Sequence, residues 1–349
     1  MNKKSSLGIA VILLSCIAVG VVVSQKGNQT AATDETIMEH VEVPEQFAGM
    51  EYMALALEQL QNATSFQGEF RNVFGSETLS GGEEETVTEA MISMVLEPFM
   101  IGMQESTNYG AINQISSIYL EEGSVKDGVQ MINAYMNYGT SRSSEWTEMS
   151  VTEEGAHRFY DIYDGLHNMI VLLEYGTNWV EVSEKNDVYT VEGDIPAEDV
   201  YTVVTEGNFF KLGGMSGIDE IFFEDVEAVH MTLTIGVDGT PLSYELDLTD
   251  GLNAVIQTIS VQMYGEEVNL TAPTIAEYRI EQKITSLNGL NSIMIPEEAK
   301  EAINYEEEIA LMAANESAHT EKISEIAEEI ASLEEVIAPE EVAEETEAE

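Results

Sequence analysis

Residues 229–248 read VHMTLTIGVDGTPLSYELDL, and this stretch decides the fold. Asp238-Gly239 near its middle is typical of a two-residue hairpin turn, because both turn positions favour a positive φ. Pairing the flanking residues outward from the turn gives one face of apolar pairs only: Ile235–Leu242, Leu233–Tyr244, Met231–Leu246 and Val229–Leu248. The pairs on the opposite face are polar: Thr234–Ser243, Thr232–Glu245 and His230–Asp247. The turn and the alternation agree, so we expect an antiparallel sheet with one buried face and one solvated face.

Similar alternation recurs along the chain and predicts many strands with a few helices. The further strands are expected at 65–75, 86–96, 129–138, 145–151, 178–183, 187–192, 257–264 and 275–284. Apolar residues at helical spacing predict helices at 47–62 and 153–175, and Pro196 is typical of the first turn of another helix. The fold class that follows is α+β with an antiparallel sheet.

The chain is strongly acidic, with 65 Asp and Glu residues against 13 Lys and Arg and a net charge of −52. Such a charge repels phosphates, which argues against nucleic-acid binding and against docking on anionic lipid through a basic patch. Solubility in an acidic or salty exterior explains the charge, and loose binding of divalent cations is the functional alternative. Because carboxylates are so abundant, a pair of them does not indicate a catalytic acid and base.

The N-terminal segment predicts export. Residues 7–23 carry no charge, follow Lys3-Lys4 and are just long enough to span a bilayer, whose core needs about 17–25 apolar residues. Three interpretations stay open: a signal peptide cleaved after Val22-Val23-Ser24, a lipoprotein signal with lipid attached at Cys16, and an uncleaved signal-anchor helix. All three predict export, and the last two tie the rest of the chain to the outer face of the cytoplasmic membrane. Since Cys16 is the only cysteine, that part must be stable without disulfides.

Composition divides the chain into four parts: a signal or anchor at 1–25, a polar linker at 26–46, a folded domain at 47–300 and an acidic tail at 301–349. Apolar residues recur at spacings of three and four in the tail, namely Ile323, Ile326, Ile330, Leu333 and Ile337. A single acidic helix fits this pattern, and so does a short coiled coil with a second copy or a protein partner.

Motifs for catalysis are missing, so we expect no enzyme, no cofactor and no catalytic residue. Ser216 lies between glycines in GGMSGI, but a nucleophile elbow would need Gly where Ile218 stands. Neither Gly-Gly pair of the chain is followed by the Gly-Lys-Ser/Thr of a phosphate loop.

Two His-Asp pairs on the predicted helix at 153–175 are the nearest approach to a metal site. His157 and Asp161 are four residues apart, and Asp164 and His167 are three apart. A metal needs three or four convergent ligands, whereas residues at these spacings commonly pair on a helix surface. We therefore interpret them as surface pairs and expect no metal.

Four motifs together resemble a group of uncharacterised Gram-positive exported proteins with the fold of the periplasmic lipoprotein carriers and the mycobacterial lipid-binding lipoproteins. The motifs are VLEPFMIGM (95–103), MINAYMNYGTSRSSEWTEMSV (131–151, with Tyr135 and then Trp146-Thr147-Glu148), VDGTPLSYELDL (237–248) and IMIPEEA (293–299). The resemblance covers about 48–300. It implies a curved antiparallel half-barrel sheet with helices on the concave side, often enclosing an apolar cavity for acyl chains. The poor lipobox at Cys16 and the acidic tail depart from that family, and no catalytic residue carries over.

Apolar strand residues are the candidates for lining such a cavity. They are Phe66, Phe70, Ile92, Met94, Leu96, Met231, Leu233, Ile235, Tyr244 and Leu246. The expected function is that of an exported, membrane-tethered, non-enzymatic protein that holds a lipid or acyl chain. The alternative is a structural or regulatory cell-envelope module with a filled core, which acts through its surface and the helix at Ile323–Ile337.

Overall fold

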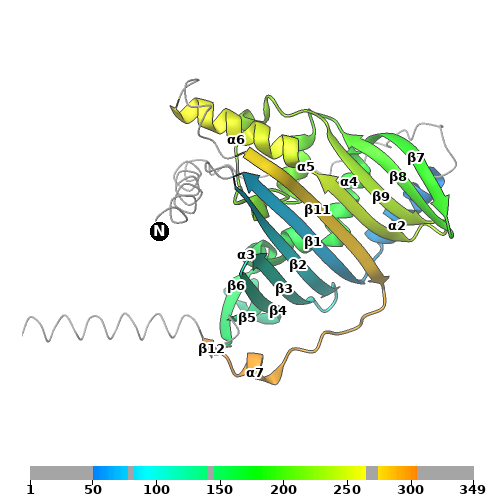
Figure 1. Ribbon diagram of the computed structural model, residues 1–349. Coiled ribbons are helices and arrows are strands. Elements are labelled where there is room, and N and C mark those ends of the chain that lie inside the picture. Colours follow the sequence, from blue (N-terminus) through cyan, green and yellow to red (C-terminus); the bar gives the residue numbers. More distant parts are fainter. Residues whose placement is uncertain (1–49, 78–81, 140–144, 265–273, 305–349) are drawn as a thin grey trace, which may run out of the picture.

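The structure is a computed structural model, and it describes residues 50–77, 82–139, 145–264 and 274–304 (Figure 1). Three predictions lie outside the described residues: the membrane segment with Cys16, the linker at 26–46 and the helix at Ile323–Ile337. Within the described ranges, no helix combines the length and the apolar composition that crossing a bilayer requires.

The described strands form one open sheet of twelve strands in the order β12-β6-β5-β4-β3-β2-β1-β11-β10-β9-β8-β7. All neighbours are antiparallel except β12, which runs parallel to β6. The strands are β1 (Ser65–Glu77), β2 (Glu83–Val95), β3 (Met100–Tyr109), β4 (Ile112–Lys126), β5 (Val129–Gly139), β6 (Thr147–Thr152), β7 (Thr177–Lys185), β8 (Val188–Ile195), β9 (Val229–Gly236), β10 (Pro241–Asp247), β11 (Thr274–Leu287) and β12 (Ile303–Asn304). The expected antiparallel α+β architecture is confirmed.

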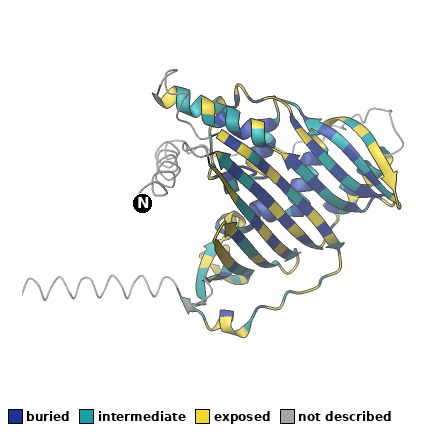
Figure 2. Cartoon of the chain, in the orientation of Figure 1, coloured by how far each residue is buried: buried dark blue, intermediate teal, exposed yellow. Residues whose placement is uncertain are grey.

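Helices other than α7 cover one face of the sheet, which we call the inner face (Figure 1). The helices are α2 (Met50–Gln61), α3 (Glu153–Tyr160), α4 (Gly165–Tyr175), α5 (Val200–Glu206), α6 (Thr249–Tyr264) and α7 (Glu297–Lys300), with 3₁₀ turns η1 (Asp161–Tyr163), η2 (Lys211–Gly213) and η3 (Glu220–Phe223). α3 packs on β5 and β6, whereas α4 packs on both α2 and α5, and α2 and α4 also contact the strands from β9 to β11. Burial alternates along the strands (Figure 2), because their inner residues join the helices in one apolar core.

A smaller apolar cluster lies on the outer face. Residues after β11 pass over this face, where Ile295 and Ala299 pack with Tyr135 of β5. A Cβ on Gly102 of β3 would lie 2.9 Å from Ile293 Cγ2, so the glycine permits this close approach. The closing IMIPEEA motif therefore serves to hold the chain against β3 to β6.

The turn of the predicted hairpin contains three residues rather than two. Gly236 N donates to Thr240 O at 2.8 Å, and Gly239 has a φ of 78°. A three-residue loop that ends in a left-handed glycine is the next most common hairpin connection. The turn rests on α2, where a Cβ on Gly239 would lie only 2.4 Å from Leu55 Cβ.

The predicted register is confirmed beyond the turn, because a β-bulge between Pro241 and Ser243 compensates for the extra turn residue. Ile235 pairs with Pro241 instead of Leu242. The pairs that occur as predicted are Leu233–Tyr244, Met231–Leu246, Thr234–Ser243 and Thr232–Glu245. His230 instead contacts Asp194 of β8, with 3.2 Å between Nδ1 and Oδ1.

The strand predicted at 257–264 is wrong, since these residues continue α6. Ile259, Val261 and Met263 alternate as in a strand, but the buried Leu252 and Val255 upstream start the helix. The hydroxyl of Ser260 donates to Ile256 O at 2.7 Å, and that of Thr258 donates to Ala254 O at 3.0 Å. Both polar side chains are thus satisfied by the helix itself.

The single helix predicted at 153–175 is also wrong, because η1 separates α3 from α4. Asp164 caps α4 by accepting from Leu166 N and His167 N at 3.2 and 3.1 Å. Pro196 precedes α5 by a turn, in which Asp199 N donates to Pro196 O at 2.9 Å, and the helix begins only at Val200. The other predicted strands and the helix at 47–62 occur with small changes of boundary, whereas β3 and β4 were not predicted.

Candidate functional site

Nine of the ten predicted cavity residues are buried in the apolar core between the sheet and the helices. The tenth, Leu96, follows β2 and is 40% exposed. Phe66 pairs with Met94, Leu233 with Tyr244 and Met231 with Leu246, so the nine do come together on the inner face. Their side chains pack against one another and against the helices, which gives this region a filled interior.

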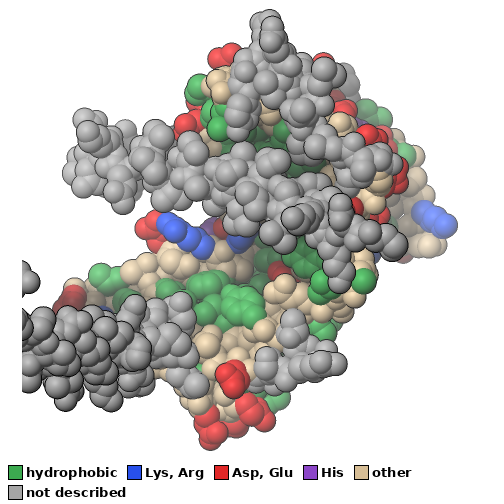
Figure 3. Space-filling view, turned by 60° about the vertical axis from the view of Figure 1, so that its left-hand side comes forward, with side chains coloured by type: hydrophobic (Ala, Val, Ile, Leu, Met, Phe, Trp, Pro, Cys, Tyr) green, Lys and Arg blue, Asp and Glu red, His purple; other side chains and the backbone are tan. Residues whose placement is uncertain are grey.

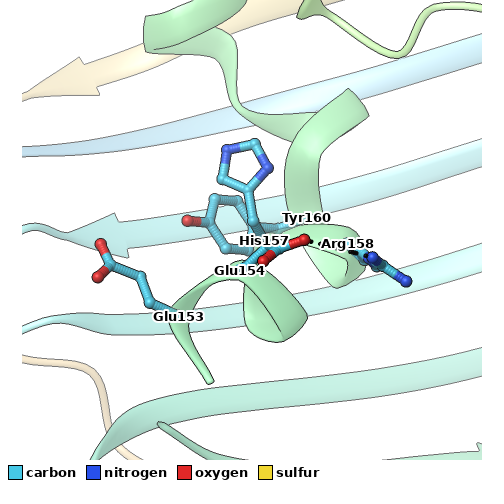
Figure 4. Close-up of a pocket in the computed structure, with 5 residues that line it drawn as sticks. All are labelled: Glu153, Glu154, His157, Arg158 and Tyr160. Carbon is cyan, nitrogen blue, oxygen red and sulfur yellow. Dashed lines mark ion pairs between the residues drawn. The ribbon is translucent and has the colours of Figure 1, made fainter. Parts of the chain in front are cut away.

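An open hollow of about 480 Å³ lies beside α3 and is formed by that helix alone (Figure 4). Its lining residues are Glu153, Glu154, His157, Arg158 and Tyr160. Arg158 pairs with Glu154 at 3.5 Å, and the His157 ring lies 4.9 Å from the Tyr160 ring. Both charged side chains are largely exposed, so this hollow offers a ligand little enclosure.

A row of polar side chains crosses the inner face and marks a more informative site. Strand register aligns seven residues in the order Tyr138, Ser116, Glu105, Ala90, Phe70, Gln282 and Tyr244, from β5 to β10, and all but Ala90 and Phe70 carry a polar group. We call it the polar row. It is unusual because Ser116, Gln282 and Tyr244 are buried in a face that is otherwise apolar.

Tyr163 of η1 lies across the polar row and connects its two halves. Its hydroxyl donates to Glu105 Oε2, and its carbonyl oxygen accepts from Gln282 Nε2 at 3.2 Å. Its ring meets the Phe70 ring edge to face at a centroid distance of 4.8 Å. Burial, and then the charge of Glu105, raise the pKa of the Tyr163 hydroxyl well above its ordinary value, so the hydroxyl remains a donor.

Asn168 of α4 continues this network into the core. Its Nδ2 donates to Ile162 O at 3.0 Å and to the Tyr244 hydroxyl at 3.3 Å, and that hydroxyl donates to Gln282 Oε1 at 3.4 Å. Among the described residues, Asn168 Oδ1 is the one buried side-chain oxygen without a partner. The network fixes η1 and α4 against the middle of the sheet.

Asp161 contradicts its interpretation as a surface residue. It is 7% exposed, and its Oδ1 accepts from Lys211 Nζ at 2.6 Å and from Ile162 N at 2.8 Å. Its Oδ2 accepts from Asn208 Nδ2 at 2.8 Å. The ion pair between Asp161 and Lys211 joins η1 to η2, and it does not involve His157. Asp164 also has a structural role, because it caps α4. Burial raises the pKa of its carboxyl above the ordinary value.

Exposed large hydrophobic side chains also lie on the inner face, and one of them, Tyr138, belongs to the polar row itself. Tyr109, Ile112 and Tyr138 are 53%, 63% and 55% exposed. Alternation from the buried Met103, Ile118 and Met136 puts them on the same face as these core residues. Figure 3 shows hydrophobic side chains gathered in the middle of the molecule, beside a few basic and His side chains. We call Tyr109, Ile112 and Tyr138 the exposed patch.

The sequence interpretation missed Glu105, Tyr109, Ile112 and Ser116 because it did not predict β3 and β4. A signal for these strands exists in the alternation of Ile101 with Met103, and in Gly110, which has a φ of 70° at the hairpin turn. Nothing in the sequence distinguishes Glu105 from the other acidic residues, since its position depends on pairing with distant strands.

No family model matches the chain, and no curated protein does so. A solved structure of a DUF1329 family protein from Desulfovibrio piger is similar at 8% sequence identity, with a TM-score of 0.21. The match covers 69% of this chain and 94% of that chain. A score this low carries no argument about function. In the described part of the chain, no three His, Cys, Asp or Glu residues are grouped so that they could hold a metal ion.

Proposed function

We propose that this protein holds the apolar chain of a lipid, or the acyl chain of a lipoprotein, against the inner face of its sheet and catalyses no reaction. The observation that carries the proposal is the exposed patch of Tyr109, Ile112 and Tyr138, which continues the buried inner face and is left exposed by the helices that the structure describes. Exposed apolar surface on the inside of a helix-covered sheet favours an apolar ligand. Burying a chain there contributes about 0.8 kcal/mol per methylene group.

The proposed cellular setting is export and tethering to the outer face of the cytoplasmic membrane through the N-terminal segment. The resemblance to lipoprotein carriers supports this setting, and the antiparallel sheet with helices on one face agrees with the fold that the resemblance implies (Figure 1). The buried core next to Tyr138 includes Met103 and Met136, which lie one row along the inner face. Flexible methionine side chains can repack around chains of different shape.

Native mass spectrometry of the full chain, released gently from its membrane, tests the proposal. We expect a co-purified lipid or acylated species. The variant Tyr109→Asp/Ile112→Asp should lose it, while Val180→Asp/Val182→Asp should keep it. The control residues are 60% and 52% exposed but lie on β7 at the far edge of the sheet. Absence of any bound amphiphile, or its retention by the patch variant, rejects the proposal.

A second candidate is a structural or regulatory cell-envelope module, and the filled interior around the nine predicted cavity residues favours it. Such a module would act through its surface and the helix predicted at Ile323–Ile337. Deleting 301–349 should then abolish a partner interaction or change the oligomeric state. An unchanged pull-down and an unchanged mass in solution would remove this candidate.

A further inference from the structure

Glu105 lies on the inner face, and no Lys, Arg or His of the described residues forms an ion pair with it. It is half-buried on β3, and within the described part of the chain its two oxygens accept from neutral hydroxyls: Oε2 from Tyr163 and Oε1 from Thr107 at 3.3 Å. A carboxylate withdrawn from water is normally paired with a cation. Asp161, close by on η1, has such a partner in Lys211 at 2.6 Å.

The exposed patch lies to one side of this carboxylate. Tyr138 lies in the same row two strands away, which corresponds to about 10 Å at the usual strand spacing. Tyr109 lies four residues along the same strand, or about 13 Å at 3.3 Å per residue. If the charged group of a ligand paired with Glu105, an alkyl chain attached to that group would thus reach the two tyrosine rings and Ile112. Aromatic faces also attract ammonium groups.

We infer that Glu105 and the exposed patch form a subsite for an amphiphile that carries an ammonium group at the end of its alkyl chain. The ammonium group would pair with Glu105, and the chain would lie over Tyr138, Tyr109 and Ile112. This inference rests on the proposed function and names the class of ligand within it. The large negative charge of the chain repels a carboxylate or phosphate head group and attracts an ammonium, so it reinforces the choice.

Photo-crosslinking of the full chain in its membrane tests the inference. Three dodecyl probes with a diazirine on the chain would be used, with an ammonium, a hydroxyl or a carboxylate as head group. Peptides from β3 to β5 would be quantified by mass spectrometry. We expect the ammonium probe to label these peptides about tenfold more than the carboxylate probe, as one charge-assisted contact predicts.

Glu105→Gln should bring the ammonium and hydroxyl probes to equal labelling. The matched control is Glu121→Gln, because Glu121 also accepts from a tyrosine hydroxyl, Tyr135 at 2.9 Å, but lies on the outer face. Tyr163→Phe removes a donor from Glu105 while it keeps the ring on Phe70, so the preference for ammonium should rise several-fold. That conservative variant decides the question if Glu105→Gln does not fold.

The outcomes distinguish failure of the head-group subsite from failure of the proposed function. If all three probes label β3 to β5 equally and Glu105→Gln changes nothing, the head-group subsite is refuted while the proposed function stands. If no probe labels these peptides, the proposed function and the subsite fail together. An ammonium preference that falls equally in the Glu105 and Glu121 variants reflects net charge alone and also overturns the subsite, as does an unchanged or lower preference in Tyr163→Phe.

Discussion

Replacing Asp161 by Ala should destabilise the protein strongly, because the substitution leaves a lysine without its carboxylate. The Asp161 oxygens accept from Lys211 Nζ at 2.6 Å, Asn208 Nδ2 at 2.8 Å and Ile162 N at 2.8 Å. Breaking a buried ion pair by removing one partner costs about 3–5 kcal/mol. The Lys211 side chain is 28% exposed and can turn toward water, which favours the lower end, or about 3 kcal/mol. For a domain of this size, that corresponds to a fall in Tm of roughly 6–12 °C.

Thermal and urea unfolding of the full chain, followed by circular dichroism, measures this effect. The double variant Asp161→Ala/Lys211→Met should be more stable than Asp161→Ala alone, since it removes the unpaired charge as well. Glu154→Ala is the control, because Glu154 forms an ion pair with Arg158 at 3.5 Å on the surface of α3. We expect no measurable change there. A loss below about 1 kcal/mol for Asp161→Ala would refute the reasoning that the pair holds η1 on η2.

Three further predictions concern the cap of α4, the β9–β10 turn and the outer cluster. Asp164→Asn should keep the cap and equal or exceed wild-type stability at pH 7, whereas Asp164→Ala should lose about 1 kcal/mol. Burial raises the folded-state pKa of Asp164, so ionisation of its carboxyl destabilises the folded chain as pH rises through that value. In urea unfolding, the stability advantage of Asp164→Asn over the wild type should therefore disappear below pH 3.8. Gly239→Ala should lower the Tm more than Gly128→Ala, because both glycines have positive φ but only Gly239 lies against Leu55; equal losses would show that α2 does not support the turn. Ile295→Ala should speed hydrogen exchange in 289–304 without a comparable change in β8 to β10, since Ile295 packs on Tyr135; uniform exchange throughout would contradict this.

Much of the sheet is predictable because its inner and outer faces differ in polarity. The alternation in β9 and β10 predicts the pairs Leu233–Tyr244 and Met231–Leu246 correctly. The Asp-Gly signal, however, predicts a turn that is one residue shorter than the one that forms. The bulge before Ser243 restores the register that the apolar pairs require. Burial of a whole face therefore outweighs the local preference of the turn. Alternation is misleading in α6, where alternating apolar residues occur in a helix because Leu252 and Val255 anchor its start.

The candidate site was predictable only in part, because the polar row joins residues from strands that are far apart in the sequence. Alternation places Phe70 and Tyr244 on the inner face, but it does not say that β11 lies between their strands. Phe70 meets Gln282 only because β1 pairs with a strand about two hundred residues later in the chain. Glu105 then enters the row through β2, and Tyr163 through a break in a helix that the sequence pattern suggests is continuous. A site assembled from five or more long-range pairings leaves no local motif, so its chemistry becomes readable only from the register of the folded sheet.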